Sequence, residues 1–292
     1  MLMHLNAGPC KTRSHSRARL VLLALLSGEL VLVLATDTLL LGQSRIGQAQ
    51  PTVGQPGKDV EWVPTPPELI NQMLEMAEVS PQDVVMDLGS GDGRLVIAAA
   101  RLGARAIGIE YDPGLVALST RNATAAGVLP RTTFMNVDLF DVDLSSATVI
   151  TMFLLPDINL ALRPKLLQLP PGTRIVSNTW SMEDWTADET VVIEPCPSWC
   201  TALLWIVPAQ VGGVWQLPQS TLVLEQRFQE ISGTLRSGHG MVQITEGRLR
   251  GNQISFRAGE KRYTGYVHGV TIQGVAKTAM RAFDWSATRI EH

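Results

Sequence analysis

The sequence is poor in histidine and in net charge, and each shortage excludes a class of function. Its 292 residues include five histidines, none of which lies between residues 16 and 238. A Ser-His-Asp or Cys-His nucleophile is therefore excluded from that stretch, together with most kinds of zinc site. The formal net charge of -3 offers no positive surface to a phosphate backbone, so no nucleic acid partner is predicted.

Cysteine is equally scarce, with only Cys10, Cys196 and Cys200 in the chain. Cys10 lies in a basic N-terminal stretch, whereas Cys196 and Cys200 flank a predicted turn. This C-x₃-C pair leaves two interpretations open: a disulfide that closes a hairpin in an oxidising compartment, or two reduced, small apolar residues beside a turn. The pair alone does not decide the compartment.

Charged residues make up only 17% of the chain and apolar residues 45%, which excludes a disordered protein. One apolar run, residues 20–42, follows the basic residues 11–19 and is interrupted by Glu29 and Asp37. This pattern is typical of a signal peptide or a signal anchor. We therefore predict export or membrane anchoring through residues 20–42. The alternatives are a start codon assigned too far upstream, or an organelle transit peptide, hence a cytoplasmic or organellar protein.

Composition also divides the rest of the chain. Residues 43–60 are rich in glycine, proline and glutamine, which indicates a linker. We expect four parts: a leader with the apolar segment in residues 1–49, a linker in residues 50–61, an α/β domain in residues 62–208, and a small all-β domain in residues 211–292.

Apolar strands and amphipathic helices alternate in the predicted α/β domain. Thr65 is expected to cap the first helix, with Pro66 as its first residue. Five strands are expected at residues 84–86, 106–109, 132–137, 148–153 and 173–177, with helices at residues 66–77, 95–102, 113–127 and 160–169. This alternation predicts a parallel sheet covered by helices on both faces.

Two further strands close this pattern, at residues 190–193 and 202–207. Only the cysteine turn joins them, so they must pair antiparallel. Five parallel strands closed by an antiparallel hairpin give the Rossmann-like, seven-stranded sheet of class I methyltransferases. Past Pro208 the helical period disappears, and residues 211–290 predict an antiparallel sheet or a small barrel without a catalytic cluster.

A glycine-rich turn follows the first strand of the predicted sheet. Dinucleotide binding requires a third glycine at position 94, but Arg94 stands there and the glycines are Gly89, Gly91 and Gly93. Pyrophosphate recognition is therefore disfavoured. S-adenosylmethionine (SAM) carries an ammonium group and a ribose but no phosphate, so Asp87, immediately before the turn, suits its ammonium group, and the glycines let the backbone pass close to its methionine part.

Two more acids follow the next two strands. Glu110 ends the second strand, where a carboxylate accepts hydrogen bonds from both ribose hydroxyls, and Asp138 ends the third, where it suits the adenine amino group. A single acid at such a place is commonly a helix cap, but three at adjacent strand ends favour a cofactor site. The predicted SAM site comprises Asp87, Gly89, Ser90, Gly91, Gly93, Glu110 and Asp138, and no metal site is predicted.

Several motifs resemble those of bacterial relatives of the ATP-synthase c-subunit lysine methyltransferase family. They are WVPTP at 62–66, DLGSGDGR at 87–94, EYDP at 110–113, MFLLP at 152–156 and LRPKL at 162–166. The resemblance covers roughly residues 62–180 and implies protein-lysine N-methylation. It assigns the SAM roles to Asp87, Gly89, Gly91, Glu110 and Asp138. The chain departs from the family at Trp62, where the family more often has Tyr or Phe, so the acceptor pocket is expected to differ.

No catalytic base is assigned by the sequence. Methyl transfer needs a positioned, neutral nucleophile and the exclusion of water. Asp157 follows the fourth strand, where the acceptor is expected, although an acid there more often caps the next helix. Trp180 and Trp185 are candidates for the pocket wall, and simple packing over the sheet edge is the alternative for both.

Three functions are compatible with these residues and motifs. The first is an active methyltransferase that acts on a protein lysine or, as an alternative, on a small molecule. The second is an exported, non-catalytic module of the same fold, used for binding. A NAD-dependent oxidoreductase ranks third, because Arg94 replaces the glycine that it requires.

Overall fold

The computed structural model describes residues 51–57, 61–238 and 240–290. The predicted leader in residues 1–49 lies outside the described residues, and so does the predicted membrane segment. In the described ranges, no helix has the length and apolar character required to span a membrane. Residues from Gln48 onward form one compact unit.

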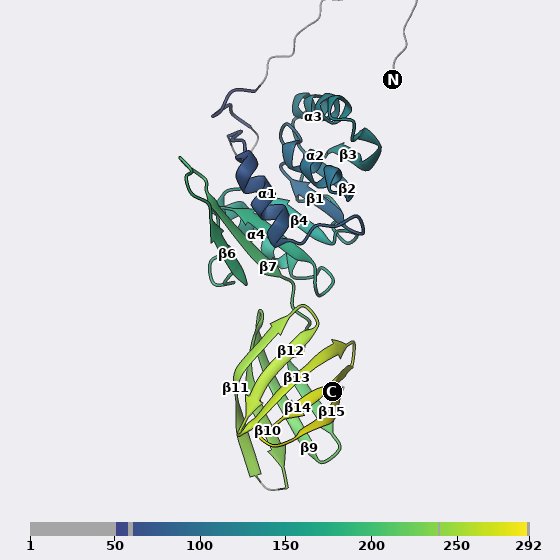
Figure 1. Ribbon diagram of the computed structural model, residues 1–292, viewed down its shortest axis with the longest axis vertical. Coiled ribbons are helices and arrows are strands. Elements are labelled where there is room, and N and C mark those ends of the chain that lie inside the picture. The colour runs from purple at the N-terminus through teal and green to yellow at the C-terminus, as the bar shows by residue number, and fades with distance from the viewer. Residues whose placement is uncertain (1–50, 58–60, 239, 291–292) are drawn as a thin grey trace, which may run out of the picture. The chain divides into compact units, whose positions relative to one another are not determined.

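A seven-stranded sheet forms the first part of this unit, in the strand order β3-β2-β1-β4-β5-β7-β6 (Figure 1). Strands β1 to β5 are parallel, and β7 runs antiparallel to both β5 and β6. The predicted class I methyltransferase sheet is therefore confirmed. The strands are Val84–Leu88 (β1), Arg105–Glu110 (β2), Thr132–Asn136 (β3), Val149–Met152 (β4), Arg174–Asn178 (β5), Glu189–Val192 (β6) and Thr201–Ile206 (β7).

Helices cover this sheet because each has one apolar face. Buried residues of α1 and α2 share one core cluster with residues of β1, β5 and β7. Buried residues of α4 share a second cluster with other residues of the same strands, as alternation of side chains along a strand requires. The helices are Pro67–Met76 (α1), Arg94–Arg101 (α2), Pro113–Ala125 (α3) and Pro156–Leu166 (α4), with a short 3₁₀ turn at Leu129–Arg131.

Two predicted helix boundaries are wrong. Pro66, not Thr65, is the N-cap of α1, and no side chain caps that helix. Thr65 is instead buried, and its hydroxyl accepts a hydrogen bond from Asn178. Helix α4 begins at Pro156, four residues before the predicted start, because a proline is favourable at the first helical position.

Eight antiparallel strands form the second part, a closed barrel. The open sheet that the sequence also allowed is excluded. Side chains alternate between the barrel core and its outer surface, as β13 shows most clearly. The strands are Gly213–Leu217 (β8), Ser220–Arg227 (β9), Glu230–Ser237 (β10), Gly240–Arg250 (β11), Gln253–Ala258 (β12), Lys261–His268 (β13), Thr271–Lys277 (β14) and Ala282–Arg289 (β15).

The segment between β5 and β6 contacts the turn between β9 and β10. The ring of Trp185 stacks on that of Phe228 with 5.8 Å between the centroids. The side-chain amide of Gln229 donates a hydrogen bond of 2.7 Å to the carbonyl of Thr186. The buried carboxylate of Asp188 pairs with Arg248 at 2.7 Å. Stacking and hydrogen bonding therefore link the sheet to the barrel.

Candidate functional site

A cavity opens at the carboxyl edge of the parallel strands, where open α/β sheets bind their ligands. Its walls come from the turn after β1, from the ends of β2, β3 and β4, and from the chain before α1. The predicted residues Asp87, Gly89, Ser90, Gly91, Glu110 and Asp138 all line it. Gly93 is not among its lining residues and instead caps α2 in a left-handed conformation.

The glycine turn is required by its backbone conformation and by its neighbours. Gly89, Gly91 and Gly93 have φ angles of 77°, 55° and 79°, in the left-handed region that favours glycine. A Cβ atom at Gly91 would lie 2.6 Å from Nε1 of Trp62. Trp62 therefore covers the turn so closely that only glycine fits beneath it.

Asp87 lies at the floor of the cavity and is buried. Burial raises the pKa of Asp87 to about 7, and the nearby carboxylates of Glu110 and Asp92 act in the same direction. The hydroxyl of Thr151 on β4 opposes this effect, since it donates a hydrogen bond of 2.8 Å to Asp87. A buried carboxylate with such a pKa favours a cationic ligand beside it.

Glu110 and Asp138 line the cavity and also hold its loops in place. Both oxygens of Glu110 accept backbone N–H groups, from Gly91 at 2.8 Å and from Asp112 at 3.0 Å. Asp138 accepts the N–H of Phe140 at 3.0 Å. A carboxylate has about four acceptor positions, so the two bonds of Glu110 leave room for a ligand while they fix its carboxylate in place.

Ser90 stands between Gly89 and Gly91 in the turn. Its side chain is buried, and its Oγ has no hydrogen-bond partner among the residues that the structure describes. A buried hydroxyl without a partner is costly. The acceptor carboxylates of the cavity and the glycine turn beside them fit SAM, which carries a cationic end and several hydrogen-bonding groups.

The sequence did not reveal how the cavity is covered. Arg94 pairs with Asp92 at 2.7 Å, donates to the carbonyl of Thr65 at 3.1 Å, and lies 5.8 Å from the ring centroid of Trp62. Arg94 thus ties the start of α2 to the chain before α1. Gly57 and Glu61, placed in a linker by the sequence prediction, also line the cavity.

The three residues predicted near the acceptor, Asp157, Trp180 and Trp185, lie in different environments. Asp157 lies in the first turn of α4 but does not cap it, because the N-cap is Leu155, and Asp157 does not line the cavity. Trp185 is completely buried and packs on Trp205 and Phe228, so the packing alternative holds for it. Trp180 contacts Trp199, at 5.9 Å between ring centroids.

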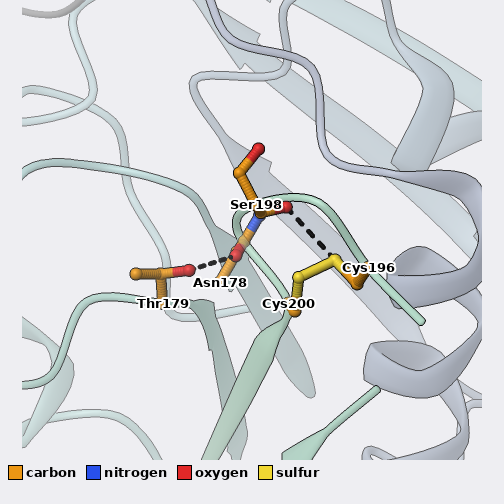
Figure 2. Close-up of a disulfide and its surroundings, with 5 residues drawn as sticks. All are labelled: Asn178, Thr179, Cys196, Ser198 and Cys200. Atoms are coloured by element: carbon orange, nitrogen blue, oxygen red, sulfur yellow. Dashed lines mark hydrogen bonds between the residues drawn. A yellow bond between two sulfur atoms is a disulfide. The ribbon is translucent and has the colours of Figure 1, made fainter. Parts of the chain in front are cut away.

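Cys196 and Cys200 form a disulfide between β6 and β7 (Figure 2). The structure thus selects the disulfide from the two interpretations that the sequence left open. The carbonyl oxygen of Ser198 lies 3.2 Å from the sulfur of Cys196. Figure 2 also shows the bond of 2.8 Å from the hydroxyl of Thr179 to Asn178, at the end of β5 beside this turn. The disulfide turn and the end of β5 are therefore neighbours.

Comparison with known proteins agrees with this geometry. The model of the ANTKMT methyltransferase domain matches residues 87–189. A protein-lysine N-methyltransferase of Saccharolobus islandicus is 41% identical over 138 residues, which are 46% of this chain and 86% of the relative. The adenine nucleotide translocase lysine N-methyltransferase of Mus musculus is 35% identical over 128 residues. The chain spans about half the length of that mouse protein, 56%.

The similar proteins also include solved structures, one of which is as follows. It is described as an RNA methyltransferase from Salinibacter ruber in complex with S-adenosyl-L-homocysteine. It is 48% identical, with a TM-score of 0.49, and the match covers 51% of this chain and 96% of that one.

Proposed function

The chain belongs to the protein-lysine N-methyltransferase family, and from that premise we propose that it transfers a methyl group from SAM to a lysine amine of another protein. One observation carries the proposal: the ends of three adjacent parallel strands place Asp87, Glu110 and Asp138 on one cavity. Its glycine turn cannot accommodate a side chain at Gly91.

Each of the three acids in the cavity suits a different group of SAM. Asp87 suits the ammonium group, Glu110 the ribose hydroxyls and Asp138 the adenine amino group. When bound, SAM supplies an electrophilic methyl group on a sulfonium sulfur.

The chain itself contributes positioning and the exclusion of water. A lysine amine has an ordinary pKa of about 10.4 and must lose its proton before it can react. An apolar entrance favours the neutral amine, because desolvation disfavours its charged form. Phe153, Leu154 and Met152 line the cavity next to its carboxylates and provide such an environment.

We also propose that residues 20–42 export the protein or attach it to a membrane. The basic residues before this apolar run support the proposal. The disulfide between Cys196 and Cys200 supports it independently, because disulfides persist mainly in oxidising compartments. Localisation of a tagged full chain, compared with a chain lacking residues 1–49, tests it: equal distribution of the two contradicts the proposal.

The methyl acceptor is identified by transfer of labelled methyl groups. The full chain is incubated with tritiated SAM and a cell extract, and the labelled product is divided into protease-treated and ribonuclease-treated samples. We expect label that protease releases and that acid hydrolysis recovers as methyl-lysine. Label in small molecules or in RNA contradicts the lysine proposal, and SAM binding without transfer favours a non-catalytic binding module.

A further inference from the structure

Three aromatic rings extend from the cavity to the protein surface. Phe153 lines the cavity at the end of β4. Its ring lies 5.6 Å from that of Trp199, at an angle of 58°. Trp180, just after β5, has its ring 5.9 Å from that of Trp199, at an angle of 52°. The aromatic trio of Phe153, Trp180 and Trp199 therefore connects the cofactor cavity with solvent.

Trp199 differs from the tryptophans that build the cores. Trp185, Trp205 and Trp215 are 0% exposed, whereas Trp199 is 37% exposed. Packing alone does not explain why a large ring near the cavity keeps more than a third of its surface exposed to solvent. Exposed aromatic rings next to a site commonly serve recognition, because they present a wide contact area with little conformational freedom to lose.

The backbone at Trp199 is held by several restraints. Its φ angle is 59°, an unfavourable value for a residue with a side chain. The disulfide between Cys196 and Cys200 encloses the residue. A hydrogen bond of 3.0 Å from Ile193 N–H to the carbonyl of Cys200 closes the same turn. The turn thus fixes Trp199 against Phe153.

A lysine side chain matches the chemistry of the trio. Its four methylene groups suit aromatic faces, and its charged end is attracted to them when the ring centroid lies within about 6 Å. Further in, where the apolar residues at the end of β4 line the cavity, loss of water favours the neutral form of the amine. An acceptor with a long, flexible cationic side chain is therefore better matched than a rigid polar one.

We propose that Trp199, held in place by the Cys196–Cys200 disulfide, forms with Phe153 and Trp180 the entrance that selects the acceptor lysine. This inference rests on the proposed function and names the residues that recognise the acceptor. Trp199 binds the acceptor, whereas the disulfide acts only by positioning Trp199. Neither contributes to the cofactor site, since neither lines the cavity.

The test separates acceptor recognition from cofactor binding. Poly-L-lysine is the probe, methylation by the full chain is followed with tritiated SAM, and SAM affinity is measured by calorimetry. For Trp199→Ala we expect the KM for poly-L-lysine to rise by at least about tenfold while the Kd for SAM stays within about twofold. Trp199→Phe keeps an aromatic ring, so its KM should stay within about threefold of the wild type.

A double variant tests the role of the disulfide. Cys196→Ser with Cys200→Ser should raise the KM for poly-L-lysine in the same direction as Trp199→Ala, since the turn no longer fixes the ring. Val192→Ala is the matched control, because Val192 is 58% exposed on the same hairpin and outside the trio. It should leave both KM and Kd unchanged.

Two results overturn the inference. One is a KM for Trp199→Ala that equals the wild-type value, and the other is a loss of SAM affinity in parallel with KM. If the wild type binds SAM but methylates lysine neither in poly-L-lysine nor in the cell extract, the proposed function fails instead. The entrance is then judged by titration with N-acetyl-lysine amide: a shift of the Trp199 indole N–H resonance, assigned with Trp199→Phe, supports it, and an unmoved resonance contradicts it.

Discussion

The sheet carries the acidic cavity, whereas no buried carboxylate occurs among the described residues of the barrel. In the sheet, parallel strands end at one edge, where Asp87 has a raised pKa and lines the cavity with Glu110 and Asp138. In the barrel, the indole N–H groups of Trp215 and Trp285 donate to backbone carbonyls at 2.8 and 3.0 Å. Ligand chemistry is thus concentrated in the sheet, whereas the barrel satisfies its indole groups internally.

The aromatic residues follow the same division. Phe256 and Tyr263 stack at 4.7 Å between centroids, and Trp285 meets both rings edge-on. These rings fill the barrel, as side chains do in barrels of about eight strands. The aromatic trio beside the sheet instead reaches solvent. Because the barrel core and the cavity are built from different residues, the stability of the barrel and the binding of SAM should respond to different substitutions.

The largest expected effect is on the barrel core. Trp215→Ala removes a fully buried indole, and such truncations cost about 3–5 kcal/mol. We expect the free energy of unfolding of the barrel to fall by about this amount, measured by denaturant titration and circular dichroism. SAM affinity, measured by calorimetry under native conditions, should remain within about twofold. A parallel loss of SAM affinity would break the division between the two regions.

The next effect is on the glycine turn. Gly91→Ala places a Cβ atom 2.6 Å from Trp62 Nε1 and adds strain at a φ of 55°. We expect SAM affinity to fall by at least about a hundredfold. Gly127→Ala is the matched control, because its φ is 70° but its Cβ would meet no atom within 4 Å. If both variants bind SAM equally, the contact with Trp62 is irrelevant.

The third prediction concerns pH. Because burial raises the pKa of Asp87 to about 7, the carboxyl is neutral below this pH and charged above it. The ammonium group of SAM binds the charged form, so affinity should rise about tenfold between pH 6 and pH 8 and then level off. Calorimetry across this range measures the rise, and Asp87→Asn should abolish it. An unchanged profile in Asp87→Asn assigns the titration to another group.

The raised pKa of Asp87 also makes the free energy of unfolding depend on pH when SAM is absent. The folded state holds the proton of Asp87 up to about pH 7, whereas the unfolded state releases it near the ordinary aspartate pKa of 3.8. The folded state therefore binds more protons between these values, and stability should fall as pH rises through this window. SAM should offset the loss above pH 7.

The smallest expected effect lies on the outer surface of the barrel. Arg257 and Glu246 pair at 3.1 Å, with side chains 44% and 66% exposed. Arg257→Ala should change the free energy of unfolding by less than about 1 kcal/mol, since exposed ion pairs contribute little and are screened by salt. Denaturant titration at low and high salt measures this. A loss comparable to that of Trp215→Ala would contradict the ranking.

The strand plan and the position of three acids on one cavity were predictable from the sequence for one reason. Strands that alternate with helices must be parallel, and parallel strands end at one edge. Asp87, Glu110 and Asp138 follow three of these strands, so their convergence follows from local patterns. The closed barrel was predicted only as one of two alternatives, because closure depends on pairing between its first and last strands, β8 and β15.

The covering of the cavity was not predictable in this way. The contact of Trp62 with Gly91 and the bond of Arg94 to Thr65 join segments 29 residues apart. They depend on the path of the chain, and no periodic pattern encodes that path. The placement of Trp199 depends likewise on a turn whose disulfide the sequence left open.

Asp87 at the sheet edge is proposed to hold SAM, and calorimetric titration measures this contact. SAM is titrated into residues 48–292, which form one compact unit, with and without Asp87→Ala, at pH 8. We expect the wild type to bind SAM, and we expect Asp87→Ala to raise the Kd for SAM by at least about a hundredfold. Equal binding by both proteins, or no binding by a folded wild type, would contradict it.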